Sequence, residues 1–263
     1  MIGKSHGYNS PWLLCPKPSQ QAALRLFCFP YSGASASAYY DWASVLPASV
    51  ELHSIQLPGR ANRLTEPRLT DIEPVVEAIT VALTPLLDKP FVFFGHSLGA
   101  AMIFEVARSL RRRGPSEPDA LFVSGHGAPQ VSDDSPQMHN QPDPELVESL
   151  QRLNGMAPEI LDNAELMQLI LPILRADLTI SETYVYHAEE PLSSQIFAYG
   201  GLQDRNVSRD DLDAWREQTR TDFRLRMFPG DHFYLNVSKQ LLLQALARDL
   251  DQIIRRQAAA PLR

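Results

Sequence analysis

A serine inside a short motif bounded by glycines is the first feature of this sequence that indicates chemistry. Gly95, His96, Ser97, Leu98 and Gly99 form the pattern G-x-S-x-G. An apolar run, FVFF, precedes the motif, and a helical pattern, AAMIFEVARSL, follows it. In a sharp strand-to-helix turn, glycines let the backbone pack closely while the serine hydroxyl projects above the sheet. This setting favours Ser97 as a nucleophile over a chance match in a turn.

A serine hydroxyl needs a base, and histidine titrates near neutral pH. His232 lies in FPGDHFYL after the last strand-like run, where the chain order of nucleophile, acid and histidine places the base. His126, which follows another strand-like run, is the main alternative. His96 adjoins the serine, and because neighbouring side chains on a turn diverge, we expect it to be structural. The other histidines lie near the N-terminus, within a strand pattern, or in or beside a helical insertion: His6, His53, His139 and His187.

Asp204 is the expected acid. It follows the apolar run QIFAY and precedes His232 by 28 residues. A carboxylate there would orient the imidazole and stabilise its charged form. Asp210 and Asp211 are better explained as N-capping or first-turn carboxylates of a helix. Asp231 adjoins the histidine and cannot readily turn back to its ring.

Two backbone N–H groups are expected to bind the oxyanion that acyl transfer generates. Leu98 follows the nucleophile and is the first expected donor. The second is expected in the loop FPYSGA after the first apolar run, with Ser32 as the choice and Tyr31 as the alternative. An ordinary strand-to-helix turn would also account for this loop.

Alternating strand and helix patterns must position these residues. Strand-like runs cover residues 24–29, 51–56, 91–94, 120–124, 195–199 and 223–228. Helical patterns cover residues 73–87, 100–113, 211–219 and 239–257. Several runs are apolar on both faces, as buried parallel strands require. The pattern predicts the α/β class, with a mostly parallel central sheet flanked by helices.

A helix-like insertion at about residues 129–192 breaks this alternation, and Pro172 is expected to kink or start a helix there. An insertion of this length after a strand is typical of a lid beside a site. Its apolar residues at helical spacing could shelter an acyl chain, or could simply pack the lid onto the core. They are Leu166, Leu169, Ile170, Ile173 and Leu174.

Length and composition limit the remaining possibilities. The chain has 263 residues, of which 44% are hydrophobic, which is enough to bury the core of a single domain. We expect that domain to cover residues 21–263, with residues 1–20 as a flexible leader. A net charge of −7 argues against a nucleic-acid partner.

Without a secretory pattern or an 18-residue apolar run, we expect no membrane span and a cytoplasmic protein. Cys15 and Cys28 suggest neither a disulfide framework nor a metal site, with Cys28 a buried hydrophobe, and a monomer is expected.

Six motifs, in matching order from about Leu24 to Leu250, resemble the type II thioesterases that accompany nonribosomal peptide and polyketide synthases. They resemble the family's oxyanion loop, arginine-containing loop, nucleophile elbow, lid, acid loop and histidine loop. In that order they read FPYSGASASAY, QLPGRANRLTEP, FFGHSLGA, LPILRADLTISETY, GGLQDRNVS and FPGDHFYL. Ser32 and Ala34 stand where alanine and glycine are expected, and SGHGAP replaces a more basic segment.

The resemblance implies an α/β-hydrolase fold with Ser97, Asp204 and His232 as the catalytic triad. It implies a substrate acyl group linked as a thioester to the phosphopantetheine arm of an acyl or peptidyl carrier protein. Water would release the acyl group as a free acid through an acyl-serine intermediate, with no cofactor of the enzyme's own. The implied role is editing, in which stalled or misprimed acyl groups are removed from the synthase.

Other interpretations stay open beside this one. A general carboxylesterase or lipase acting on small-molecule esters would use the same triad, and a non-catalytic binding module could occupy the same scaffold. Arg60 and Arg63 could meet a phosphate of the arm or an acidic carrier surface, or could face solvent or pair with Glu66. Residues 111–113, three arginines at a helix end, are most simply solvated residues that complement the helix dipole.

Overall fold

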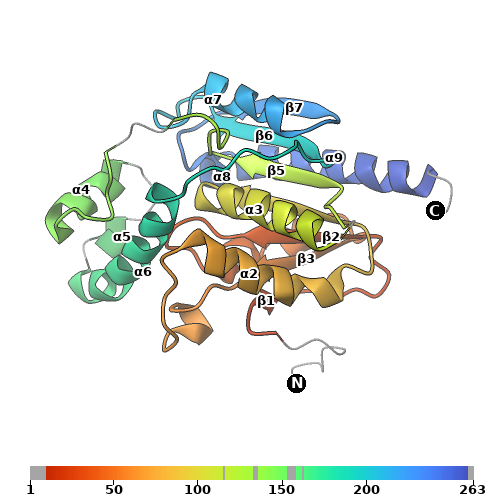
Figure 1. The fold of residues 1–263 in the computed structure, drawn as a ribbon. Helices are drawn as coiled ribbons and strands as arrows, with labels where there is room; N and C mark the ends of the chain where they lie inside the picture. The colour runs from red at the N-terminus through yellow and green to blue at the C-terminus, as the bar shows by residue number, and fades with distance from the viewer. Residues whose placement is uncertain (1–9, 115, 133–135, 153–157, 162, 260–263) are drawn as a thin grey trace.

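A seven-stranded sheet forms the centre of the protein in the part of the chain that the structure describes (Figure 1). The structure is a computed structural model that describes residues 10–114, 116–132, 136–152, 158–161 and 163–259. The strands are β1 (Leu13–Leu14), β2 (Leu24–Phe29), β3 (Val50–Ile55), β4 (Phe91–His96), β5 (Ala120–Ser124), β6 (Gln195–Gly201) and β7 (Phe223–Phe228).

The strand order is β1-β3-β2-β4-β5-β6-β7. Strands β2 to β7 pair in parallel, and β1 pairs antiparallel with β3. Because parallel strands end at the same edge of a sheet, the loops after β2, β3, β4, β5, β6 and β7 gather at one edge, which is where ligands bind in open α/β sheets.

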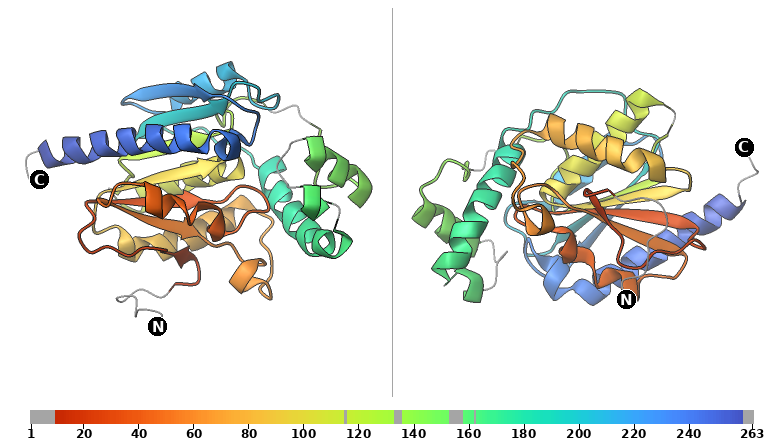
Figure 2. Two further views of the ribbon diagram at one scale, coloured as in Figure 1. Left: turned by 180° about the vertical axis from the view of Figure 1, so that it is seen from behind. Right: turned by 90° about the horizontal axis from the view of Figure 1, so that it is seen from below.

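Helices cover both faces of this sheet (Figures 1 and 2). The α-helices are α1 (Trp42–Val45), α2 (Ile72–Leu83), α3 (Leu98–Arg113), α4 (Asp143–Arg152), α5 (Pro158–Leu161), α6 (Ala164–Glu182), α7 (Arg209–Asp213), α8 (Tyr234–Val237) and α9 (Lys239–Ala259). Short 3-10 helices are η1 (Ala36–Tyr39), η2 (Ala61–Arg63), η3 (Thr84–Leu86) and η4 (Ala214–Gln218).

Alternating side chains of the strands build two cores. In β2, Phe27 and Phe29 join the cluster that contains α2 and α3, whereas Leu26 and Cys28 join the cluster that contains α9. All six residues of β2 are buried. A strand that is covered on both faces must be apolar at successive positions, which explains the run LRLFCF.

Helices α4, α5 and α6 form the insertion between β5 and β6, and they lie together at one end of the molecule (Figure 2). A separate cluster of buried side chains joins α4 to α6, including Leu146 and Leu150 from α4 and Met167 and Leu171 from α6. Helix α6 runs through Pro172 and begins eight residues earlier, so this proline does not start the helix. The expected insertion is therefore built from helices, as the sequence indicated.

The second half of the expected leader, residues 1–20, lies against the sheet. Leu13 and Leu14 pair with Ile55 and Ser54 of β3, and the guanidinium carbon of Arg63 lies 4.2 Å from the centre of the Trp12 ring. A strand of two residues is too short to leave a periodic pattern in the sequence. It forms because the open edge of β3 provides hydrogen-bonding partners for its backbone. Residues 1–9 lie outside the described residues.

The other expected elements are confirmed with small shifts at their ends. The strand predicted at 51–56 is Val50–Ile55, and the predicted helix at 211–219 is divided between α7 and η4. The mostly parallel α/β sheet flanked by helices is also confirmed. No helix in the described part of the chain is long and apolar enough to span a membrane.

Candidate active site

Ser97 occupies a strained turn between β4 and α3. Its φ of 52° and ψ of −121° lie in a region that non-glycine residues rarely adopt. A Cβ atom on Gly95 would lie 2.1 Å from the carbonyl oxygen of Gly99, and one on Gly99 would lie 2.5 Å from that of Phe29. The two glycines of the motif are thus required by close backbone contacts. The contact with Phe29 also places the loop after β2 against the turn.

The N-terminus of α3 begins directly after this serine. Leu98 is the first residue of the helix, and Ser97 is its N-cap residue. The first N–H groups of a helix have no partner within it, and its positive end favours negative charge. The backbone N–H of Leu98 is one of these first helical groups, and its role as an oxyanion donor stays a prediction.

Asp204 and His232 are joined by a hydrogen bond between two loops. Nδ1 of His232 lies 2.9 Å from Oδ2 of Asp204, whose side chain is fully buried. The other carboxylate oxygen of Asp204 accepts hydrogen bonds from the backbone N–H groups of Asn206 and Val207. These bonds fix the carboxylate, and they leave Nε2 of His232 as the ring nitrogen that can take a proton.

Close backbone packing holds those two loops together. A Cβ atom on Gly201, the last residue of β6, would lie 2.2 Å from the carbonyl oxygen of Asp231. In addition, the side chain of Gln203 accepts a hydrogen bond from the backbone N–H of Gly230. The acid and the histidine therefore meet because the loops after β6 and β7 are in direct contact.

His96 lies beneath the site as a buried, neutral ring. Its Nδ1 is 2.9 Å from the Ser124 hydroxyl, which is 2.5 Å from the hydroxyl of Tyr234. Burial, reinforced by the neighbouring His232 and His126, holds the pKa of His96 well below its usual value. The ring centres of His96 and His232 are 5.1 Å apart. Among the described residues, the Ser97 hydroxyl makes no hydrogen bond to His232. In enzymes without a bound substrate, the hydrogen bond between a nucleophile and its base is often long or poorly aligned.

The alternatives for acid and base are arranged differently. Asp211 forms a capping box with Ser208 at the start of α7, as the sequence indicated, and Asp231 accepts a hydrogen bond from the N–H of Phe233. Nδ1 of His126 is 2.7 Å from the carbonyl oxygen of Gly127. The geometry therefore favours Asp204 and His232 as the pair beside Ser97.

The loop after β2 has two of its N–H groups committed to other partners. The N–H of Gly33 donates to Asp177 at 2.7 Å, and that of Ala34 donates to the Tyr31 carbonyl at 2.9 Å. Neither can then donate to an oxyanion. Ser32, with Tyr31 as the alternative, stays the predicted donor from this loop.

Asp177 is a residue that the sequence interpretation did not single out. Its fully buried carboxylate, on α6, accepts two hydrogen bonds from Arg60 at 2.5 and 2.7 Å in addition to the bond from Gly33. An acidic residue among the apolar positions of LPILRADLTI was the available signal, because buried charges are almost always paired.

Arg60 and Arg63 are both buried and both paired, so neither is a solvent-facing arginine. Arg63 donates to Glu66 at 2.8 and 2.6 Å, which is the pairing with Glu66 that the sequence analysis gave as an alternative. It also donates to the Gln56 carbonyl. At the far end of α3, Arg111 and Arg112 pair with Glu189.

The apolar residues of the expected lid divide into two groups. Leu166 and Leu169 are exposed, whereas Ile173 and Leu174 are buried. Leu174 packs over the loop after β2, since a Cβ atom on Gly33 would lie 2.6 Å from its Cδ2 atom. The second half of α6 therefore packs on the body of the protein, and the exposed leucines are in its first half.

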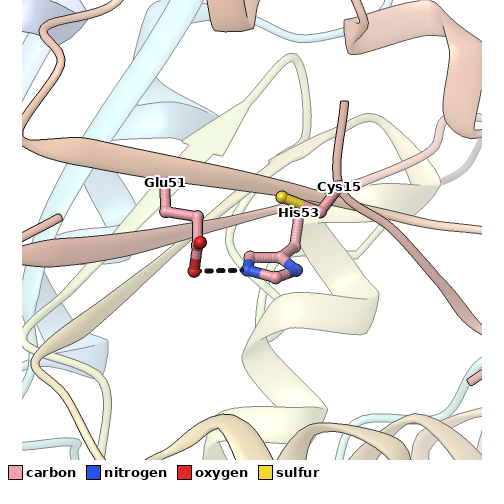
Figure 3. Close-up of side chains that lie close together, drawn as sticks. All are labelled: Cys15, Glu51 and His53. Carbon is pink, nitrogen blue, oxygen red and sulfur yellow. Dashed lines mark hydrogen bonds and ion pairs between the residues drawn. The ribbon is translucent and has the colours of Figure 1, made fainter. Parts of the chain in front are cut away.

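A second cluster of titratable side chains lies on β3 and the segment that follows β1, at the β1 side of the sheet. Figure 3 shows Cys15, Glu51 and His53 close together, with a hydrogen bond of 2.9 Å between Glu51 and His53. Although burial opposes it, bonds from His53, the Ser19 N–H and Arg25 hold the pKa of Glu51 at about 2. Burial and the nearby Glu51 raise the pKa of the Cys15 thiol to about 11.

These contacts account for the cluster as a structural network. A thiol binds a metal as the thiolate, which this setting disfavours, and the carboxylate oxygens of Glu51 already have donors. Cys15 and Cys28 are both free thiols, and Cys28 is buried as expected. We therefore interpret the cluster as an anchor that holds residues 15–19 on β3.

One edge of this mostly parallel sheet carries a strained serine after β4, a carboxylate after β6 and a histidine after β7. This arrangement defines an α/β-hydrolase. The family model described as "Thioesterase domain" matches residues 24–254. The chain thus belongs to the thioesterase domain family, whose members are thioester hydrolases.

Several known proteins align with most of this chain. The chain is 41% identical to the gramicidin S biosynthesis protein GrsT of Aneurinibacillus migulanus over 92% of its own length and 95% of that protein. It is 37% identical to thioesterase PikA5 of Streptomyces venezuelae, over 86% of this chain and 80% of that one. Among solved structures, the type II thioesterase BorB from the borrelidin biosynthetic cluster superposes with a TM-score of 0.85 at 33% identity, covering 92% of this chain and 98% of BorB.

Proposed function

We propose that this protein is a type II, editing thioesterase of nonribosomal peptide or polyketide biosynthesis. Its substrates would be acyl groups on the phosphopantetheine arm of acyl or peptidyl carrier proteins. The observation that carries the proposal is the bond between the buried Asp204 and His232 beside the strained Ser97. The similarity to GrsT and BorB over nearly the full chain supports the substrate class.

Ser97 is the nucleophile of this proposal. Nε2 of His232 takes the hydroxyl proton as the oxygen attacks the thioester carbonyl, and Asp204 stabilises the imidazolium that forms. The N–H groups of Leu98 and Ser32 bind the negative oxygen of the tetrahedral intermediate. The imidazolium then gives its proton to the departing thiol, which leaves the acyl group on Ser97.

Water completes the reaction by the same route. His232 takes a proton from water, the resulting hydroxide attacks the acyl-serine carbonyl, and the free acid leaves as Ser97 recovers its proton. Each step uses side chains, backbone N–H groups and water alone, so we propose that the enzyme needs no cofactor or metal. We further propose a cytoplasmic monomer that acts on carrier proteins rather than on nucleic acid or membranes.

Comparing substrates tests this proposal against the general carboxylesterase or lipase. Acetyl and longer acyl groups are presented on a phosphopantetheinylated carrier protein, on N-acetylcysteamine and on p-nitrophenol, with Ser97→Ala as the background. We expect kcat/KM for the carrier-linked thioester to exceed that for the free thioester by at least tenfold, about 1.4 kcal/mol of additional transition-state binding. Equal or faster cleavage of the p-nitrophenyl esters would instead support a general esterase.

A further inference from the structure

One side chain of the helical insertion reaches the loop that carries the expected oxyanion donor. Asp177 of α6 lies 144 positions from Gly33 and 117 from Arg60, and it binds both. Its Oδ2 accepts the Gly33 N–H at 2.7 Å and Nη1 of Arg60 at 2.5 Å, while its Oδ1 accepts Nη2 of Arg60 at 2.7 Å. Three segments that are distant in sequence thus meet at one buried carboxylate.

The loop at this point has a conformation that needs support. Gly33 has a φ of +80°, and the N–H of Ala34 closes a turn onto the carbonyl oxygen of Tyr31. Arg60 also donates to the Ala34 carbonyl at 3.3 Å, and the side chain of Gln56 accepts the N–H of Ala36. The loop residues that flank Ser32 are therefore held from outside by charged and polar side chains.

The pairing with Arg60 also matters for the charge near the site. An unpaired carboxylate bonded to Gly33 would oppose the negative charge that develops on a nearby substrate oxygen. A bidentate arginine neutralises that carboxylate and fixes its orientation. The guanidinium is itself buried, so water does little to screen either group.

Packing gives a second, independent contact between α6 and the same loop. Leu174 lies one helical turn before Asp177 and packs directly over Gly33. Further along the helix, Ile180 belongs to the same core cluster as α3, whereas Leu174 and Leu178 belong with Met167 to the cluster shared with α4. The second half of α6 thus packs both on the body of the protein and on the rest of the insertion.

We infer that Asp177, held by Arg60, is a positioning residue that sets the oxyanion loop through the Gly33 N–H. This inference rests on the proposed acyl-transfer function. Asp177 does not touch the reacting atoms. By occupying the Gly33 N–H, it leaves the neighbouring N–H of Ser32 as the oxyanion donor and fixes where that group lies.

A matched pair of substitutions on α6 separates this role from simple stabilisation of the insertion. Asp177→Asn keeps the shape of the side chain but removes its charge. Glu182→Gln removes a carboxylate on the same helix that binds the N–H groups of Met138 and His139, away from the oxyanion loop. Both variants are assayed with a p-nitrophenyl ester, so that the result does not depend on carrier preference.

The inhibition constant of an alkyl boronic acid is the second readout. A boronate bound to a serine is a tetrahedral anion that uses the oxyanion donors. Because losing one oxyanion donor costs about 100-fold to 1,000-fold in rate, we expect a displaced donor in Asp177→Asn to lower kcat at least about tenfold. KM should change less than about twofold, and the boronate should bind weaker by nearly the factor lost in kcat/KM. Glu182→Gln should keep the wild-type kcat and boronate affinity.

Several outcomes would overturn the inference. A folded Asp177→Asn protein with wild-type kcat and boronate affinity would do so, as would an equal loss in Glu182→Gln. If Asp177→Asn does not fold, Arg60→Lys replaces it, because lysine keeps the charge but loses the bidentate geometry, and unchanged kinetics there would also reject the role. Failure of the wild-type enzyme to cleave any ester or thioester would instead reject the proposed function.

Discussion

His232 and Asp204 are joined by a 2.9 Å hydrogen bond although they lie on separate loops, after β7 and β6. The carboxylate is fully buried and the imidazole largely so. A buried carboxylate that also accepts two backbone N–H groups has little freedom to turn. The histidine is thus held in one tautomer, with its other nitrogen free for proton transfer.

Asp204→Asn should lower kcat by about 100-fold to 10,000-fold, because an amide no longer imposes the catalytic tautomer or stabilises the imidazolium. Hydrolysis of a p-nitrophenyl ester measures the effect. Asp210→Asn is the matched control, since Asp210 is an exposed carboxylate in the same loop region, at the start of α7. A kcat within about threefold of wild type for Asp204→Asn would reject Asp204 as the acid, because orienting carboxylates contribute far more than this.

His232→Ala should prevent labelling of Ser97 by a fluorophosphonate, since the serine then lacks its base. His126→Ala should label at the wild-type rate, because Nδ1 of His126 bonds to the Gly127 carbonyl. Labelling is followed by intact-protein mass spectrometry over time. Efficient labelling of His232→Ala together with a loss in His126→Ala would exchange the roles assigned to the two histidines.

Gly99→Ala should destabilise the fold and disturb the site together. The new Cβ atom would lie 2.5 Å from the Phe29 carbonyl oxygen, so the loop after β2 must shift. Overpacking of this kind costs about 1–3 kcal/mol in the free energy of unfolding, measured by urea denaturation. Gly114→Ala is the control, because a Cβ atom there meets nothing within 4 Å. Equal stabilities of the two variants would contradict the close packing described for the serine turn.

The stability of the protein should fall as pH decreases below about 6.5, the ordinary pKa of histidine, in part because of His96. The pKa of the folded-state ring is well below its usual value, so the unfolded chain binds a proton that the folded chain does not. One such proton gives a slope of up to about 1.4 kcal/mol per pH unit in that range. At high pH both states are neutral at this residue and the effect vanishes.

Urea unfolding at pH 7.5 and 5.5 measures this linkage. His96→Gln, which cannot take up a proton in either state, should lose less stability than wild type between the two pH values. His187→Gln, a substitution of an exposed histidine, should behave like wild type. The same pH dependence in His96→Gln and wild type would show that the buried ring does not cause the effect.

Much of this architecture could be predicted from the sequence because buried parallel strands leave continuous apolar runs. The runs at β2 and β5 are buried at every position and coincide with the observed strands, as does the half-buried, alternating run at β7. The order of Ser97, Asp204 and His232 along the chain was sufficient to choose these residues, since in a parallel sheet each strand delivers its loop to the same edge. Their catalytic roles remain predictions.

Contacts between residues that are distant in the sequence could not be predicted from local sequence patterns. Asp177 reads as one acidic position in a helix, and nothing local to it indicates Arg60 or Gly33 as partners. The short strand at Leu13–Leu14 depends likewise on an edge supplied by β3. In both cases the tertiary structure, rather than local propensity, creates the feature.

The most direct measurement is the identification of the acyl-enzyme formed from a carrier protein. The enzyme is mixed with acyl-phosphopantetheinyl carrier, quenched in acid within the first turnover, and digested for mass spectrometry. We expect an acyl group on Ser97 in the wild-type enzyme, and neither adduct nor turnover in Ser97→Ala. An adduct on another residue, or turnover retained by Ser97→Ala, would contradict this expectation.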